Sequence, residues 1–468
     1  MIPENFAIRV DASLAPETCS VPGHLLLALQ VKPDQPVTIF AGNRQARANL
    51  KESNFLPQTI SISPATAAQL YIPPELNLDL MVLPGRGTLR LGPFIAIYGY
   101  KNLAGRRIFS EQTSYFRKLC QVSRKMHALT YVVAPEDLNI NAGFTYGHVL
   151  EKSATGLRWT KKALPLPDVF YDRGLFPKGP YKMTGIKVRR YLRAAWGDKF
   201  FNPKFFDKWR THLWLSEHAV LRRYLPTTVH IQAAEAAKNF IARHSSVYLK
   251  PSGGSSGRGI LRVRRDRNSY ICEYLKKKVI YRSVYGNLDQ MWQDLLDKQM
   301  LNKKFIVQQD LNLAQYQARP FDVRVLMQKG LDGKWRFTGM AARLGGSNAI
   351  TTNLHAGGTA QPLEQILSAL FGAKKAYQMQ SEIEHLSFLT CSWVEQVSGL
   401  QFGEIAVDVG IDNTGKIWLI ELNAVPGRTV FTKIGPAHLT KQAVSRPIEY
   451  ALYLAGFGKM QNNEQELI

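Results

Sequence analysis

The chain has 468 residues and a formal net charge of +24, with 60 Lys and Arg against 36 Asp and Glu. Its hydrophobic fraction of 45% is ordinary for a folded protein, and its length predicts about three domains. No apolar run approaches the ~18 residues that a membrane-spanning helix needs, and the first residues are acidic where a signal peptide is basic and then apolar. We therefore expect a cytoplasmic protein without a transmembrane segment.

The excess of positive charge predicts an anionic substrate or partner without saying which one. Nucleotide, nucleic acid, acidic polypeptide and anionic envelope polymer all fit. Much of the charge lies between Lys178 and Arg223, and a solvated basic surface without a dedicated partner is an equal alternative there. No zinc-finger or RNP-like motif accompanies it, so nucleic acid is the weaker candidate. The four cysteines show neither disulfide nor zinc spacing, and we expect them to be reduced: Cys19, Cys120, Cys272 and Cys391.

The first part of the chain, residues 1–88, consists of short apolar runs separated by Pro, Gly and Asn. This spacing predicts a small β domain. The runs are FAIRV, HLLLALQV, VTIFAG, TISIS and LDLMVLP.

The pattern changes after residue 88. A buried-strand run over 91–100, a helical stretch over 110–126 and a strand-like run over 128–134 predict a parallel α/β unit. We place this second domain, with a basic linker, at 89–200. A mixed domain follows at 201–458, with helices predicted at 288–301 and 362–377. Residues 459–468 are a polar tail.

The stretch VYLKPSGGSSGRGILRV, residues 247–263, sets Lys250 at the end of an apolar run and before a loop of Gly and Ser. Such a loop leaves backbone N–H groups free to face an anion, usually phosphate. The spacing matches neither a P-loop nor the dinucleotide fingerprint. Strand, glycine loop and strand remain, with Lys250 beside the loop. A flexible hairpin without a ligand is the alternative.

The strongest chemical signal lies in EIAVDVGIDNTGKIWLIELNAVPGR, residues 404–428. With 412–415 as the turn, Ile411 faces Lys416 and Asp408 faces Leu419. Asp408 then shares one strand face with Glu421 and Asn423, three oxygen donors that suit Mg²⁺. The alternative is that the two acids pair with surface Lys or Arg. The other face is predicted to be apolar, with Ile405, Val407, Val409, Ile411, Trp418, Ile420 and Leu422.

Several polar and charged residues lie in the sequence between the glycine loop and this hairpin. A strand ending at Gln308 and Gln309 is interpreted as an edge whose backbone reads an adenine. Asp322 and Arg324 are two residues apart on one strand, and Arg343 lies at the end of another. A second polar glycine loop, TTNLHAGGTA, covers 351–360. Each of these signals is weak alone.

Together these segments resemble the ATP-grasp superfamily: KPSGGSSGRGI, IVQQDL, DVRVL, Arg343, NLHAGG and the closing D…ELNAVPG, in that order. NLHAGG with IAVDVGID and IELNAVPG is similar to glutamate ligases that modify a ribosomal protein. FFDKWRTHLWL…YLPTT, over 205–228, makes the chain most similar to the YheC/YheD-like, endospore coat-associated family. The resemblance is specific from about 200 to 435. It implies an α+β ATP-grasp fold after a small α/β pre-ATP-grasp domain, and the N-terminal small β domain precedes both.

The resemblance also implies roles for residues. Lys208 and Lys250 would neutralise ATP phosphates, and Gln308, Gln309 and Leu311 would border the adenine. Mg²⁺ would be held by Asp408, Glu421 and Asn423. Arg324, Arg343 and Asn353 would face the γ-phosphate and the acceptor. The loop that would close over the phosphates contributes Ser252, Gly253, Gly254, Ser255, Gly257 and Gly259.

From these roles we expect an ADP-forming carboxylate–amine ligase that works through an acylphosphate. Its acceptor would be anionic or acidic, and the protein would be cytoplasmic or associated with the spore coat. Two alternatives stay open. One is an ATP-dependent phosphotransferase on the same fold, and the other is a nucleotide-binding structural component of the spore coat.

Overall fold

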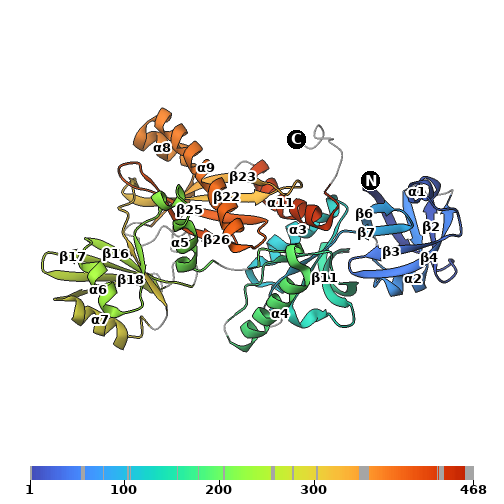
Figure 1. Cartoon of the computed structure of the whole chain (residues 1–468), viewed down its shortest axis with the longest axis horizontal. Helices are drawn as coiled ribbons and strands as arrows, with labels where there is room; N and C mark the ends of the chain where they lie inside the picture. Colours follow the sequence, from blue (N-terminus) through green and yellow to red (C-terminus); the bar gives the residue numbers. More distant parts are fainter. Residues whose placement is uncertain are drawn as a thin grey trace.

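The computed structural model describes residues 3–53, 58–76, 78–102, 105, 107–154, 156–177, 179–203, 206–253, 259–276, 279–301, 304–346, 358–428, 431 and 437–458. Four sheets follow one another along an elongated molecule, with the N-terminal barrel at one end and the sheet that contains β16 to β18 at the other (Figure 1). None of the helices in these ranges is long and apolar enough to cross a membrane.

The N-terminal sheet closes into a barrel in the order β1-β5-β2-β4-β3-β7-β6. Alternation explains its core, since Ala46, Ala48 and Leu50 of one strand face inward while their neighbours are exposed. The strands are β1 (Glu4–Val10), β2 (Thr18–Pro22), β3 (Pro36–Ala41), β4 (Arg44–Ser53), β5 (Thr59–Ile62), β6 (Leu78–Gly85) and β7 (Thr88–Gly92), so the barrel extends past residue 88.

Two short helices, α1 (Gly23–Leu29) and α2 (Pro64–Gln69), accompany the barrel. The interpretation of HLLLALQV as one of the strand-like runs is wrong, because α1 occupies it. Its buried residues are Leu25, Leu26 and Leu29, the spacing of a helix face and not the alternation of a strand.

The second sheet has the order β10-β11-β9-β8-β13-β14, with β12 paired to β11. β8 and β9 are parallel and joined through α3, which confirms the predicted strand–helix–strand unit. The elements are β8 (Phe94–Tyr98), α3 (Thr113–Lys125), β9 (Leu129–Val133), β10 (Leu138–Asn139), β11 (Phe144–Ser153), β12 (Gly156–Pro165), β13 (Val169–Asp172), α4 (Pro180–Trp196) and β14 (Phe200–Phe201).

The third sheet, which we call the first lobe, has the order β15-β20-β16-β17-β18-β19. One face buries Val247, Leu249 and Val263 in the core that it forms with α6 and α7. The elements are β15 (Thr228–His230), α6 (Ala234–Ala242), β16 (Ser246–Pro251), β17 (Leu261–Asp266), β18 (Ser269–Lys276), β19 (Val279–Tyr285), α7 (Leu288–Asp297) and β20 (Phe305–Gln309).

The fourth sheet, the second lobe, has the order β24-β23-β22-β25-β26, with β21 paired to β22. Helices α5, α8 and α9 contribute to the core on one of its faces. The elements are α5 (Lys208–Ser216), β21 (Gln315–Tyr316), β22 (Arg319–Lys329), β23 (Trp335–Leu344), β24 (Thr359–Gln361), α8 (Leu363–Phe371), α9 (Ala373–Ser398), β25 (Glu404–Ile411), β26 (Ile417–Asn423) and α11 (Ala437–Ala455).

Two helix predictions need comment. The helix predicted over 288–301 forms as α7, but it ends at Asp297, four residues earlier than expected. The segment predicted as one helix over 362–377 is divided between α8 and α9 at Gly372, whose φ of +80° lies outside the helical region. The C-terminal helix α11 packs on the second sheet and α3, where Ile448 and Leu452 share a core with Ile97 and Phe116.

Candidate functional site

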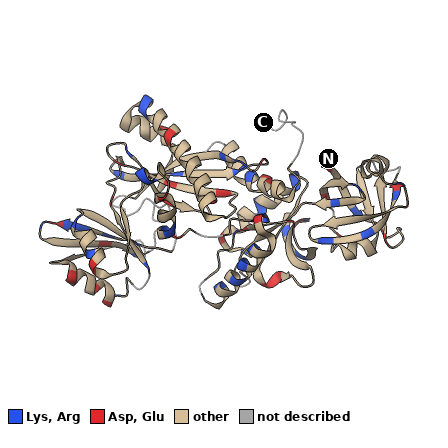
Figure 2. Cartoon of the chain, in the orientation of Figure 1, with Lys and Arg blue, Asp and Glu red and all other residues tan. Residues whose placement is uncertain are grey.

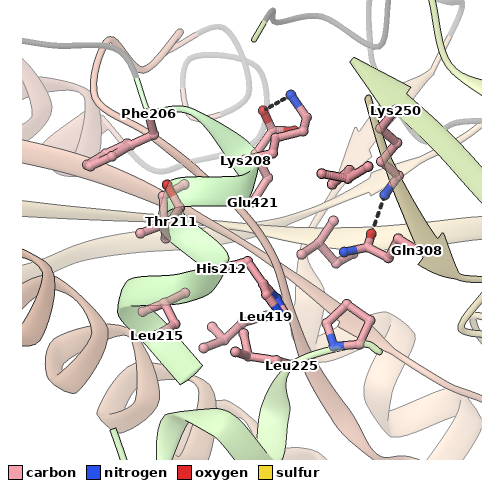
Figure 3. Close-up of a pocket in the computed structure, with 14 residues that line it drawn as sticks. Phe206, Lys208, Thr211, His212, Leu215, Leu225, Lys250, Gln308, Leu419 and Glu421 are labelled. Atoms are coloured by element: carbon pink, nitrogen blue, oxygen red, sulfur yellow. Dashed lines mark hydrogen bonds and ion pairs between the residues drawn. The ribbon is translucent and has the colours of Figure 1, made fainter. Parts of the chain in front are cut away.

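A pocket lies where the two lobes meet (Figure 3). The space between its walls, open mouth included, is about 550 Å³, a size typical of small-molecule sites. One end is charged and the other is apolar. Its lining residues are Phe206, Lys208, Thr211, His212, Leu215, Leu225, Pro226, Lys250, Ile306, Gln308, Leu419, Ile420, Glu421 and Leu422.

Lys208 is positioned by the start of α5. Asp207 caps the helix by accepting a hydrogen bond from the Arg210 N–H at 3.0 Å. The Ser252 hydroxyl donates to the same carboxylate at 2.9 Å, and the Ser252 carbonyl accepts from the Lys208 N–H at 2.9 Å. The helix start is thereby fastened to the residue that follows β16. The Lys208 ammonium lies 3.1 Å from a Glu421 carboxylate oxygen, across the mouth of the pocket.

Lys250 projects from β16 and is half-buried. Its Nζ donates to Gln308 Oε1 at 2.6 Å, and Gln308 in turn donates to the Thr228 hydroxyl at 3.0 Å. Burial lowers the pKa of Lys250 to about 8, because the attraction of Glu421 only partly offsets the loss of water and the repulsion of Lys208. An anion bound in the pocket would therefore stabilise the charged, ammonium form of Lys250.

The strand β20 is not the sheet edge that its sequence predicted. It lies between β15 and β16, so the interpretation of its end as a sheet edge is wrong. The Gln309 N–H donates to the Thr227 carbonyl at 2.9 Å, which occupies that backbone group within the sheet. Gln308 lines the pocket, whereas neither Gln309 nor the half-buried Leu311 beyond the strand end does.

The hairpin β25–β26 pairs with a register different from the predicted one. Asp408 lies opposite Glu421 and Val409 opposite Leu419, so Ile420 is an extra residue in the second strand. Such a bulge shifts the alternation by one residue. It brings the two carboxylates directly opposite each other, closer than the predicted register would.

The same bulge decides which side chains share a face. Asn423 lies opposite Ala406, hence on the face of Asp408 and Glu421, as predicted. On the core face the first strand is as expected, but Trp418 and Ile420 are not its partners. The core partners from β26 are Ile417, Leu419 and Leu422.

Two arginines from neighbouring strands surround Asp408. Arg324 of β22 lies opposite it in the ladder, with Nε 2.5 Å from Oδ1. Arg343 of β23 donates two hydrogen bonds of 2.6 Å to Asp322 and places its Nη2 3.0 Å from Asp408 Oδ2. Burial alone would lower the pKa of Arg343, but the two carboxylates outweigh it and raise the pKa. For Arg324 burial prevails and lowers the pKa. Asp408 and Glu421 do pair with cationic side chains, as in the alternative to a metal site. The two arginines, however, are buried and do not lie on the surface.

The donor set fits a hard divalent cation. Asp408 Oδ1 is buried and accepts no hydrogen bond in the described structure, although Arg324 lies beside it. Two carboxylates and the Asn423 amide supply the oxygen ligands that Mg²⁺ prefers. The described residues hold no cluster of three His, Cys, Asp or Glu, and the third oxygen donor of the expected set is Asn423 Oδ1, which also accepts from the Val425 N–H at 3.0 Å. A cation there would compete with Arg324 for Asp408 and with Lys208 for Glu421.

Several predicted residues lie outside the described ranges: Gly254, Ser255 and Gly257 of the glycine loop, and Asn353 with the NLHAGG segment. Of the remaining loop positions, Ser252 is buried and Gly253 is exposed. Gly259 has a φ of +76°, a conformation that favours glycine.

Sequence reasoning missed the wall that α5 builds. Thr211, His212 and Leu215 follow Lys208 at the spacing of one helix face, and this spacing is the signal that could have found them. Burial lowers the pKa of His212, whose ring stacks on Trp209. The buried Thr211 hydroxyl has no hydrogen-bond partner among the described residues.

Two α+β lobes with a pocket between them, Lys250 on the wall from the first lobe and Lys208 and Glu421 on the wall from the second, are the arrangement of an ATP-grasp protein. The chain belongs to the YheC/D-like ATP-grasp family, whose model matches residues 197–454. The expected family and fold are thereby confirmed.

Two curated relatives carry the same family name. The endospore coat-associated protein YheD of Bacillus subtilis (strain 168) is 27% identical over 461 residues, covering 97% of each chain. YheC of the same organism is 23% identical over 324 residues, covering 69% of this chain and 85% of YheC. Both are described as coat-associated, which states a location and not a reaction.

Solved structures with a similar fold share far less sequence. The ATP-grasp ligase PsnB, complexed with its minimal precursor, is 12% identical with a TM-score of 0.46, covering 76% of this chain and 99% of PsnB. D-alanyl-alanine synthetase A from Vibrio cholerae is 13% identical with a TM-score of 0.43, covering 76% of this chain and 98% of that enzyme.

Proposed function

We propose that the protein is an ADP-forming carboxylate–amine ligase that activates its acceptor as an acylphosphate. The observation that carries the proposal is the facing pair of Asp408 and Glu421, with Lys208, Arg324 and Arg343 in ion-pair contact. Phosphoryl transfer needs neutralisation of charge and precise positioning more than covalent catalysis by the protein. The lysine and arginines of this site provide the cationic groups for that neutralisation.

The reaction divides into two steps. A carboxylate oxygen of the acceptor attacks the γ-phosphorus of ATP, and ADP leaves. An amine then attacks the acyl carbon, inorganic phosphate leaves with the former carboxylate oxygen, and the amine nitrogen loses a proton. Lys208 and Lys250 would neutralise the polyphosphate throughout. Arg324 and Arg343 would stabilise the transferring group and the tetrahedral oxyanion.

Mg²⁺ would be held by Asp408, Glu421 and Asn423, and when bound it would neutralise the phosphate oxygens. Gln308, with Gln309 and Leu311 nearby, would border the base at the inner end of the pocket. The glycine loop from Ser252 to Gly259 and Asn353 would complete the site.

The acceptor is proposed to be acidic, because the segment before the first lobe is strongly basic. Helix α4 carries Lys182, Lys187, Arg190 and Arg193 on exposed positions (Figure 2). Residues 173–197 contain no Asp or Glu. The coat association of the relatives supports a component of the spore coat as acceptor, and the basic charge of α4 supports an acidic one.

An isotope experiment tests the chemistry. Candidate carboxylates and amines are screened for ATP consumption, and a positive acceptor is then labelled with ¹⁸O in its carboxylate. The ligase predicts ADP as the nucleotide product and one labelled oxygen in inorganic phosphate. Release of AMP and pyrophosphate would exclude the proposal. A stable phosphorylated product without phosphate release would identify a phosphotransferase, and nucleotide binding without turnover a structural protein.

A further inference from the structure

The outer edge of the first lobe offers a strand that is paired on one side only among the described residues. β19 is the last strand of its sheet, and among the described residues it pairs only with β18. An edge strand presents a row of backbone N–H and C=O groups that another chain can pair with. Its sequence, VIYRSVY, contains no Pro or Gly and a single charge, Arg282. The devices by which proteins usually protect an edge are therefore nearly absent.

Large apolar side chains are exposed along the same hairpin. Val284 is 62% exposed and Val279 54%. Scattered exposed apolar residues are normal, but several on one short hairpin indicate a binding surface. The exposed set is Leu275, Val279, Ile280, Tyr281 and Val284.

Part of this surface lies on the sheet face that carries Lys250. Side chains directly opposite each other in a sheet point to the same face. The cross-strand row that starts at Arg282 continues through Glu273, Arg262 and Tyr248. Tyr248 is two residues from Lys250, and Val284 and Ile280 are two residues from Arg282, so all of them share this face. The opposite face packs on α6 and α7.

The surrounding charge indicates what kind of chain fits. Between residues 261 and 285 the acids are Asp266 and Glu273. Pairing of two copies of β19 would bring these basic hairpins together, which is unfavourable. An acidic chain would be attracted instead. The basic residues are Arg262, Arg264, Arg265, Arg267, Lys276, Lys277, Lys278 and Arg282.

We propose that β19 is a docking strand for an extended, acidic segment of another polypeptide, which adds to the sheet as a further strand. Main-chain hydrogen bonds provide the pairing, Val284 and Ile280 provide apolar contacts, and Arg282 together with the net positive charge of the hairpin attracts carboxylates. The inference goes beyond the nucleotide chemistry, because this surface is formed without the carboxylate pair of the second lobe.

Hydrogen exchange on the full chain, without nucleotide, tests the proposal. The probe is a synthetic peptide of alternating Glu and Val, compared with peptides of Gln and Val and of Lys and Val. The outward amides of β19 exchange quickly in the free protein and become protected with the Glu peptide, and protection weakens as salt rises. Absent protection, or equal protection by the Lys peptide, would overturn the proposal. Protection that grows with protein concentration alone would instead identify an interface between copies of this chain.

A pair of matched variants locates the binding. Val284→Glu introduces a like charge on the strand and should weaken the Glu peptide about tenfold or more. Leu27→Glu changes an even more exposed apolar residue, on α1 of the barrel and 81% exposed, and should leave binding unchanged. Equal effects of both variants would show that net charge alone binds the peptide. Since no nucleotide is present, neither outcome depends on the ligase proposal.

Discussion

Two acidic residues of β25, Glu404 and Asp408, occupy the same face of one strand and each meets two arginines, yet their surroundings differ. Glu404 is fully buried. It pairs with Arg173 at 2.9 Å and with Arg428, and it also accepts from Tyr171 and Gln328. Every direction around this carboxylate is filled, so it has no capacity for a ligand.

The partners of the two acids come from different parts of the chain. Tyr171 belongs to β13 of the second sheet and Arg173 directly follows that strand, so the Glu404 cluster joins that sheet to the second lobe. Asp408 meets Arg324 and Arg343 from its own sheet, lies opposite Glu421 and keeps one oxygen without a hydrogen bond. The comparison separates a saturated buried acid, which joins two sheets, from a buried acid with one oxygen that accepts no hydrogen bond, which is the one we propose as a metal ligand.

The largest effect should follow from breaking the saturated cluster. Glu404→Gln leaves Arg173 and Arg428 with uncompensated buried charge, and we expect a loss of about 3 to 5 kcal/mol in the free energy of unfolding. The shift in the midpoint of urea unfolding measures it. Glu421→Gln, at a partly exposed acid, is the matched control and should shift the midpoint little. Equal shifts would remove the distinction between joint and site.

Activity, unlike stability, should depend strongly on the two acids of the proposed site. Asp408→Asn and Glu421→Gln keep the shape of each side chain but remove the charge that would hold Mg²⁺ in the proposed site, so ATP turnover should fall about 100-fold or more. Asparagine is preferred to alanine at 408 because it can still accept a hydrogen bond from Arg324 or Arg343. Circular dichroism checks that both variants are folded. Turnover near the unchanged level in both would refute the site.

The pH dependence of nucleotide affinity should report Lys250. In the free site its pKa is lowered to about 8, and a bound polyphosphate favours the ammonium and raises that pKa. Affinity should therefore be constant below pH 8 and fall above it, by at most about tenfold per pH unit. Equilibrium binding of ATP between pH 7 and 10 measures this. Lys250→Arg stays charged and should bind with a flat profile; a fall of the same size in that variant would assign the effect elsewhere.

The smallest effect concerns the joint between α5 and β16. Asp207→Ala removes the cap of α5 and the bond from Ser252, and should cost about 1 kcal/mol of stability. Because Lys208 is the next residue, ATP affinity should also fall by a few fold. Asp207→Asn retains a capping oxygen and should restore most of both. If only stability changes, the cap supports the helix without positioning Lys208.

Local rules account for what could be predicted within the site. The strand–loop–strand around Lys250 follows from apolar alternation interrupted by Gly and Ser, and the hairpin from two strand patterns flanking Asp412–Gly415. The grouping of Asp408, Glu421 and Asn423 on one face was predicted correctly, although the pairing on which it rested was wrong. The bulge at Ile420 places Glu421 and Asn423 back on the face of Asp408, and the local sequence pattern does not predict this bulge.

The sequence by itself determined most of the elements, α1 and the break between α8 and α9 excepted, because the spacing of apolar residues and the turn chemistry act within a few residues of the chain. It also determined the family, whose motifs are local. Only the tertiary structure decided that β20 is interior, that α5 forms a wall of the pocket and that Glu404 differs from Asp408. Those features depend on which segments distant in the sequence become neighbours, as those of Arg173 and Glu404 do. The energy of a buried charge likewise depends on all partners around it and not on its place in the sequence.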